Sequence, residues 1–197
     1  MDTYQEIYDA IISRTKRPTQ IRETENAIAA ATLYLHNVGF FTNDLDSVLL
    51  QASSAASQFD VDFVSNPRVR TINQVIPITV TGESCDPLRR VTAATCKLSD
   101  TNWYRYTGKQ LLIRTRVPYT QFQVEYYSAP VVQRAAYNSW IAFKYPYMVI
   151  DAAYERLCRD LGLAEEAQRV ERLIGNSRIP ESYVHILIAE NEVNLSV

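Results

Sequence analysis

The chain of 197 residues carries 20 Lys+Arg against 22 Asp+Glu, for a net charge of −2, and 47% of its residues are hydrophobic. This length fits one domain or a core with one inserted lobe, and the balanced charge argues against a protein held to nucleic acid by a net basic field. Two histidines, 3 cysteines and 5 glycines argue against most zinc sites, disulfide frameworks and phosphate loops, whereas 13 tyrosines favour a protein that makes contacts.

Helical periodicity of apolar residues predicts four helices, over about residues 3–13, 19–37, 140–161 and 163–174. Pro146 lies inside the third but off its apolar stripe, so we expect a kink that leaves the buried face intact. Gly162 ends this helix and makes the third and fourth helices neighbours. The stripe expected to be buried consists of Trp140, Phe143, Tyr147, Ile150, Tyr154, Leu157 and Leu161.

Between the second and third helices, alternating β-branched and aromatic residues predict strands at 59–64, 75–80 and 121–126. A hairpin is expected over 103–114, turning at Thr107–Gly108, and Pro77 places its strand at a sheet edge or a bulge. Residues 45–57 fit either a strand or a short helix. The segment 59–127 holds nine Lys+Arg and six Asp+Glu, a net charge of +3, which leaves −5 for the rest of the chain.

These elements predict an α+β fold with a four-helix core formed by residues 1–44 and 131–176. An antiparallel β lobe, residues 45–130, is inserted into this core, and residues 177–197 form an extended C-terminal tail. The tail contains an apolar stretch, Tyr183–Ala189, which either packs back on its own domain or joins another chain as a strand or arm. No stretch is long and apolar enough to predict a membrane span.

The sequence offers little for catalysis, because the dinucleotide, P-loop and nucleophile-elbow motifs are all missing. His36 is interpreted as a helix-end or interface histidine, and His185 belongs to the tail. Asp60 and Asp62 share one strand face, where a solvated surface is favoured over a carboxylate dyad or cation site. We therefore expect that the protein is not an enzyme and binds neither a cofactor nor a metal. The alternative from another functional class is a hydrolase that uses Asp60, Asp62 or the histidines.

The three cysteines are expected to remain thiols. Cys158 is expected to be half-buried and inert, and Cys85 and Cys96 flank a turn in the β lobe.

Arginines and tyrosines are interleaved in the β lobe, which predicts an interface with a neighbouring subunit or a tail protein. A platform for single-stranded nucleic acid uses the same residue types, but the acidic helical part opposes it. The expected interface residues are Arg89, Arg90, Tyr104, Arg105, Tyr106 and Tyr119.

Four stretches resemble the head-to-tail adaptor proteins of tailed bacteriophages, also called connector or head-completion proteins, including the tail tubular protein A type. Residues 11–18, the 23–35 helix and Phe40–Phe41 are similar to the opening helix pair of that family. Residues 103–113 look like its central hairpin, and residues 124–130 look like the strand that leaves the lobe. Residues 139–162 with 165–167 resemble its closing helix pair.

The resemblance implies a virion structural protein at the head–tail junction, assembled in the host cytoplasm. Such a protein forms a homo-oligomeric ring, expected to be a dodecamer, that docks under the portal protein and offers a surface to a tail or nozzle protein. Genomic DNA passes through the ring without sequence-specific binding. The tail residues expected to contact the portal are Ile179, Tyr183, Ile186 and Ile188. The alternative within the virion is a tail-completion or stopper protein that contacts the tail rather than the portal.

Overall fold

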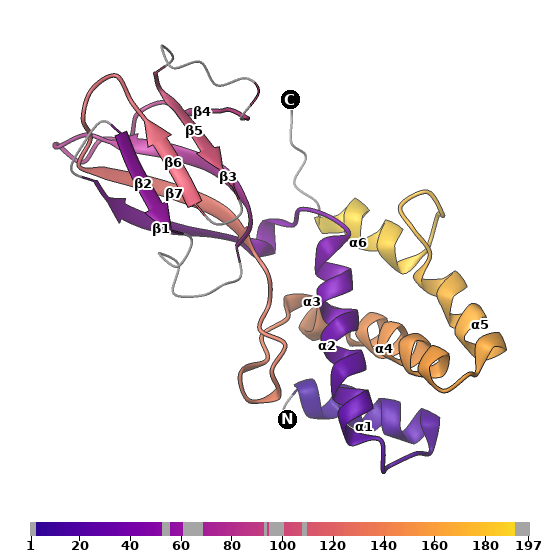
Figure 1. The fold of residues 1–197 in the computed structure, drawn as a ribbon. Coiled ribbons are helices and arrows are strands. Elements are labelled where there is room, and N and C mark those ends of the chain that lie inside the picture. The colour runs from indigo at the N-terminus through magenta and orange to yellow at the C-terminus, as the bar shows by residue number, and fades with distance from the viewer. Residues whose placement is uncertain are drawn as a thin grey trace. The chain divides into compact units, whose positions relative to one another are not determined.

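The computed structural model describes residues 3–52, 56–60, 69–92, 94, 101–107 and 110–191, and of residues 56–60 only the backbone. The fold is α+β, as predicted, and the chain forms two compact units. The helical unit comprises Met1–Asp44 and Ala129–Val197, and the β lobe comprises Leu45–Ser128. Figure 1 shows the helices and strands with the labels used below.

The two opening helices agree closely with the prediction. Helix α1 spans Thr3–Thr15 and α2 spans Ile21–Asn37. On α1 the fully buried side chains Tyr4, Ile7 and Ile11 recur at steps of three and four, as a helix packed on a core requires. The buried residues of α2 are Thr24, Ala27, Ile28, Ala31, Thr32, Leu35 and His36.

The expected third helix is in fact two helices, α3 (Trp140–Lys144) and α4 (Pro146–Asp160). The break is at Tyr145, whose backbone lies at φ −134° and ψ 59°. A residue that precedes proline is disfavoured in the helical region, and Pro146, which lacks an N–H, is accommodated in the first turn of the new helix. Proline therefore breaks this segment instead of kinking it.

The break also changes which face is buried. Phe143 is 82% exposed and Tyr147 43% exposed, although both belong to the stripe predicted to be core. A non-helical residue at position 145 shifts the rotational phase between the two helices, so the spacing that spans the break does not mark one face. Of the predicted stripe, Leu157 is buried, and Trp140, Ile150, Tyr154 and Leu161 pack in part against the core. The other buried side chains are Ile141, Ala142, Tyr145, Met148, Val149, Ala152, Ala153 and Cys158. Cys158 is thus fully buried and not half-buried.

Helix α4 ends in a tight turn that leads into α5 (Ala164–Ile174). Gly162 has a φ of 73°, and its N–H donates to Arg159 O at 3.0 Å while the Leu163 N–H donates to Cys158 O at 2.8 Å. These two bonds form a Schellman motif, which favours glycine at this position. Helix α5 faces the core with Ala167, Val170 and Ile174, whereas Leu163 and Leu173 are exposed.

Most of the predicted extended tail is not extended. Residues Tyr183–Asn191 form a helix, α6, with Val184 and Leu187 buried in the helical unit. The Oγ of Ser182 accepts the His185 N–H at 3.3 Å, which caps the first turn. The sequence suggested a strand or arm because this run is apolar on every side, but a run without glycine or proline is also compatible with a helix.

The β lobe consists of two sheets with strand orders β1-β7-β3 and β2-β6-β5-β4. The first contains β1 (Leu45–Gln51), β7 (Gln121–Ser128) and β3 (Val69–Ile78). Residues 45–51 are therefore strand, and Pro77 lies on an edge strand, as predicted. The second sheet contains β2 (Ala56–Asp60), β6 (Gln110–Arg114), β5 (Trp103–Tyr106) and β4 (Arg89–Arg90).

The β5–β6 hairpin is confirmed, with Tyr106 opposite Leu111. Strand pairing is antiparallel as predicted, except that β4 runs parallel to β5. One apolar cluster joins the inner faces of the two sheets, with Phe122 and Val124 from one sheet and Leu111 and Ile113 from the other. The lobe thus has a core of its own.

Candidate functional site

The tyrosines expected at the lobe surface differ in burial, and Tyr104 belongs to the core of the lobe. Tyr104 is only 2% exposed, and its hydroxyl donates to Asn73 O at 3.2 Å. Burial raises the pKa of Tyr104, and the positive charge of Arg90 partly offsets this. Tyr106 and Tyr119 are partly buried against the same apolar cluster, and Tyr119 lies beside Cys85, whose hydrogen bond raises the pKa of the phenol. Tyr104 is therefore a core residue, and Tyr106 and Tyr119 remain partly accessible.

Four arginines of the lobe lie on the second sheet, and Arg70 lies on β3 of the first. Arg89 and Arg90 form β4 and are exposed, and Arg105 is half-buried in β5. The Nε atom of Arg105 is buried and has no hydrogen-bond partner within the described part of the chain. Arg114, on β6, is half-buried. These side chains make the second sheet the basic part of the lobe.

The tail residues expected to bind the portal lie on or just before α6. Ile179 is 45% exposed, whereas Tyr183, Ile186 and Ile188 pack in part against the core of the helical unit. Of the two uses that the sequence left open for this stretch, the structure shows packing on its own domain. Ile179 is the member of this set that is most available to a partner.

Tyr183 fixes the start of α6 to the core. Its hydroxyl donates to Asp151 Oδ2 at 2.5 Å, and Arg14 of α1 donates to the other oxygen of the same buried carboxylate. Burial raises the pKa of Tyr183, and the hydrogen bond to Asp151 and its charge raise it further. One carboxylate on α4 therefore holds α1 and α6 together.

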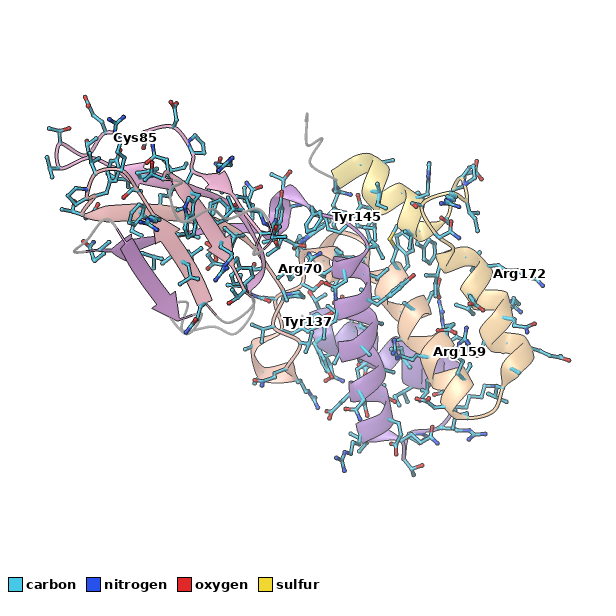
Figure 2. The ribbon with its side chains drawn as sticks, turned by 45° about the horizontal axis from the view of Figure 1, so that its top comes forward. Arg70, Cys85, Tyr137, Tyr145, Arg159 and Arg172 are labelled. Carbon is cyan, nitrogen blue, oxygen red and sulfur yellow. The ribbon has the colours of Figure 1, made fainter. Side chains whose placement is uncertain are left out.

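The end of α6 is tied to the break between α3 and α4. The hydroxyl of Tyr145 donates to Glu190 Oε2 at 2.5 Å, and Lys144 Nζ donates to Asn191 Oδ1 at 3.0 Å. Figure 2 labels Tyr145 and Arg159, both in the helical unit. The residue that proline forces out of the helix thus provides the contact point for α6.

We expect the helical unit to lose stability above about pH 10, the ordinary pKa of tyrosine. Burial raises the pKa of Tyr4 and of Tyr154 to about 12, and that of Tyr183 is raised as well. The unfolded chain then loses its phenolic protons before the folded one, so the stabilisation is complete below the unfolded pKa and is lost as the pH rises towards the folded value. Urea denaturation followed by circular dichroism at increasing pH measures this slope, and Tyr183→Phe should reduce it. An equal slope in that variant would contradict the assignment.

His36 lies in a buried polar network that has the connectivity of a catalytic triad. Its Nδ1 is 2.8 Å from Asp44 Oδ1, and its Nε2 is 2.9 Å from Ser139 Oγ. Trp140 Nε1 donates to the same Asp44 oxygen at 2.7 Å. Sequence analysis interpreted His36 as a helix-end histidine and did not single out Asp44 or Ser139. The available signal for Ser139 was its place just before a helical run, where serine caps helices.

The network is built for packing and not for access to a substrate. Ser139 is 4% exposed, and its Oγ accepts the Ala142 N–H at 3.1 Å, which caps α3. His36 and Asp44 are buried to the same degree. A serine nucleophile has to reach a substrate carbonyl, and this oxygen is enclosed and already used. The three residues instead hold together three parts of the helical unit. His36 belongs to α2, Ser139 caps α3, and Asp44 is the last residue before the lobe.

The other residues considered for chemistry are not brought together. Asp60 is known here by its backbone position in β2, and Asp62 and Cys96 lie outside the described residues. His185 is partly buried, and its Nδ1 donates to Ser177 O at 3.1 Å. Among the described residues, no group of His, Cys, Asp and Glu side chains is arranged to hold a metal ion.

A groove of about 420 Å3 lies in the helical unit between α2, α4 and α5. Its apolar lining includes Ala31, Ala152 and Ile174, and Tyr34 lines it as well. Its charged lining consists of Glu155, Arg156, Arg159, Asp160 and Glu171. No sequence pattern indicates this groove, because its residues come from three helices that meet only in the fold.

No protein-family model matches the chain, and no curated protein matches it. Within the part of the chain that the structure describes, no helix is both long and apolar enough to cross a bilayer. The two surfaces that remain candidates for function are the arginine-bearing sheet of the lobe and the charged groove of the helical unit.

Proposed function

We propose that the protein is a virion structural protein, a ring-forming head-to-tail adaptor that docks under the portal of a tailed bacteriophage. In this role it extends the DNA channel and gives the tail its attachment surface. The proposal rests on the resemblance described above and on one observation about the fold. The β lobe is an insertion, entered after Asp44 and left before Ala129, between an opening helix pair and a closing group of helices.

The stretches that carry the resemblance fall on separate elements in the expected order. Residues 11–18 end α1 and lead into α2, residues 103–113 form the β5–β6 hairpin, and residues 124–130 include the end of β7. Large apolar side chains also remain exposed on the helical unit, among them Phe143, Tyr147 and Leu173. Such side chains are suited to burial between the subunits of an oligomer. They support the proposal that this unit packs against copies of itself.

The test is to mix the purified protein with purified portal and to examine the mixture by electron microscopy. We expect a ring bound to the portal, and native mass spectrometry would count its subunits. A protein that remains monomeric and does not bind portal would contradict the proposal. A ring that binds tail components and ignores portal would favour the stopper alternative.

The part of the tail that binds portal can be tested with two matched substitutions. Ile179→Glu and Ile21→Glu each place a charge at an exposed apolar position of the helical unit. We expect Ile179→Glu to weaken portal binding by about tenfold or more, which corresponds to 1.4 kcal/mol, and Ile21→Glu to leave it unchanged. Truncation after Asn176 should abolish portal binding, but it also removes Val184 and Leu187 from the core, so the substitution is the cleaner test. Equal binding by both variants would exclude Ile179 from the contact.

A further inference from the structure

Strand β1 forms one edge of the first sheet of the lobe. It pairs antiparallel with β7 over Leu45–Gln51 without a bulge, and no other strand of the described part of the chain pairs with it. The opposite edge, β3, differs, because Leu88 N–H donates to Val75 O at 2.8 Å and Cys85 N–H donates to Pro77 O at 2.9 Å. The segment between β3 and β4 thus covers the edge of β3, whereas among the described residues nothing pairs with the edge of β1.

The register of β1 shows which of its backbone groups point outwards. In an antiparallel pair every second residue bonds to the partner strand, and the residues between them turn their N–H and C=O groups away. Ala52 N–H donates to Thr120 O at 2.9 Å, so Leu50, two residues earlier, bonds to β7 as well. The backbone groups of Leu49 and Gln51 therefore point to the open edge, where an added strand can bond to them.

This edge has little of the protection that sheets use against added strands. Lysine, proline, bulges and very short strands give such protection, but the seven residues of β1 include no lysine and no proline. One N–H group is capped, because Ser47 N–H donates to Asp46 Oδ1 at 2.8 Å. Beyond this cap the strand is apolar on its outer face, where Leu45 is 37% exposed and Leu49 is 55% exposed.

The sequence that follows α6 has the pattern of a strand that suits this edge. Helix α6 ends at Asn191, and residues 192–197, Glu-Val-Asn-Leu-Ser-Val, lie outside the described part of the chain. Val193, Leu195 and Val197 alternate with polar residues, which is typical of a strand with one apolar face. Six extended residues cover about 20 Å, which is close to the length of a seven-residue strand.

The residues just before this segment are fixed on the helical unit. Glu190 accepts a hydrogen bond from the Tyr145 hydroxyl, and Asn191 accepts one from Lys144 Nζ at 3.0 Å. Residues 192–197 therefore start from a defined point of the helical unit. Binding to a partner then has to order only six residues, which keeps the entropy cost of association low.

We infer that residues 192–197 of one copy add as a strand to the open edge of β1 in a second copy. Main-chain hydrogen bonds to Leu49 and Gln51 give the affinity, and Val193 and Leu195 cover the exposed leucines of the outer face. This inference rests on the proposed function and names the contact between its subunits. Because the segment and the edge are different surfaces, the contact is heterologous, and repeated heterologous contacts close into a ring when the rotation allows it.

Self-association, measured by sedimentation velocity, tests the two halves of the contact separately. Truncation after Asn191 removes the added strand and no described residue, and Leu49→Asp places a charge and a poor strand former on the open edge. Each change should weaken the association of the full chain by about tenfold or more. Val117→Asp should leave it unchanged and is the matched control, because Val117 is 49% exposed in the same lobe but lies outside β1. Truncation leaves the lobe intact, so the test remains valid if Leu49→Asp fails to fold.

Mixing the two variants identifies the partner of each surface. The truncated chain keeps its β1 edge, and the Leu49→Asp chain keeps residues 192–197. We expect the mixture to form a complex with one copy of each at a concentration where neither variant associates alone. Self-association of the truncated chain as strong as that of the full chain would overturn the inference and would favour pairing between two β1 edges. A mixture that forms no complex would also overturn it, as expected if residues 192–197 bind within their own copy.

The mixture with portal separates this inference from the proposed function. A ring on portal that forms undiminished with Leu49→Asp would overturn the inference and leave the proposed function standing. A wild-type chain that neither self-associates nor binds portal would contradict both.

Discussion

Replacing Asp44 with alanine is expected to lower the free energy of unfolding of the helical unit by about 3 kcal/mol. The carboxylate accepts hydrogen bonds from Trp140 Nε1 at 2.7 Å and from His36 at 2.8 Å. Asp44 and His36 are buried, and Trp140 is partly buried. Without Asp44 the His36 donor stays buried with no acceptor, and Trp140 loses its hydrogen-bond partner. An unsatisfied buried donor costs more than the net gain from an ordinary hydrogen bond, so the loss exceeds that of a typical surface contact.

The measurement is urea denaturation followed by tryptophan fluorescence. The chain has two tryptophans, and Trp140 belongs to the helical unit whereas Trp103 belongs to the lobe. In a Trp103→Phe background the signal reports the helical unit alone. Asp44→Asn is the matched control, because the amide keeps one acceptor oxygen at the same place, and we expect it to lose less than the alanine variant. A midpoint unchanged by Asp44→Ala would show that the network contributes nothing to stability.

The same network shows why part of the candidate site could not be predicted from the sequence. His36 and Ser139 are 103 positions apart, and no local pattern states that two such residues will meet. The opening helices could be predicted, because Tyr4, Ile7 and Ile11 report a buried face within one element. The hairpin at 103–114 could be predicted for the same reason, since alternation and a turn are local signals.

Two predictions of secondary structure were wrong because the spacing of apolar residues did not determine the structure of the segment. The spacing from Trp140 to Leu161 fits one continuous helix, but the residue before Pro146 cannot stay helical, and the phase changes there. The run Tyr183–Ala189 is apolar on every side, so it carries no phase at all, and its helix is set by its capping serine and by contacts with Asp151 and Tyr145. Tertiary contacts determine the secondary structure of such segments.

Replacing Gly175 with alanine is expected to detach α6 and to lower the free energy of unfolding by about 2 to 4 kcal/mol. Gly175 has a φ of 57°, and a Cβ atom there would lie 2.4 Å from Ser182 Cβ and 2.9 Å from Ser182 Oγ. Ser182 Oγ donates to Asn176 O at 2.8 Å and accepts the His185 N–H in the first turn of α6 at 3.3 Å. Moving Ser182 away therefore removes the cap and draws Val184 and Leu187 out of the core.

Hydrogen exchange of the α6 amides measures the detachment. The control Gly162→Ala separates the cost of backbone strain at a positive φ from the cost of the clash with Ser182. Gly162 also has a positive φ, 73°, but an added Cβ there meets nothing within 4 Å. Its replacement should cost only the conformational term, about 1 kcal/mol, and leave the exchange of α6 unchanged. Equal effects at the two glycines would mean that backbone strain alone accounts for the loss. A selective effect at Gly175 would show that the close packing of Gly175 on Ser182 is what keeps α6, and with it the segment bearing Ile179, on the helical unit.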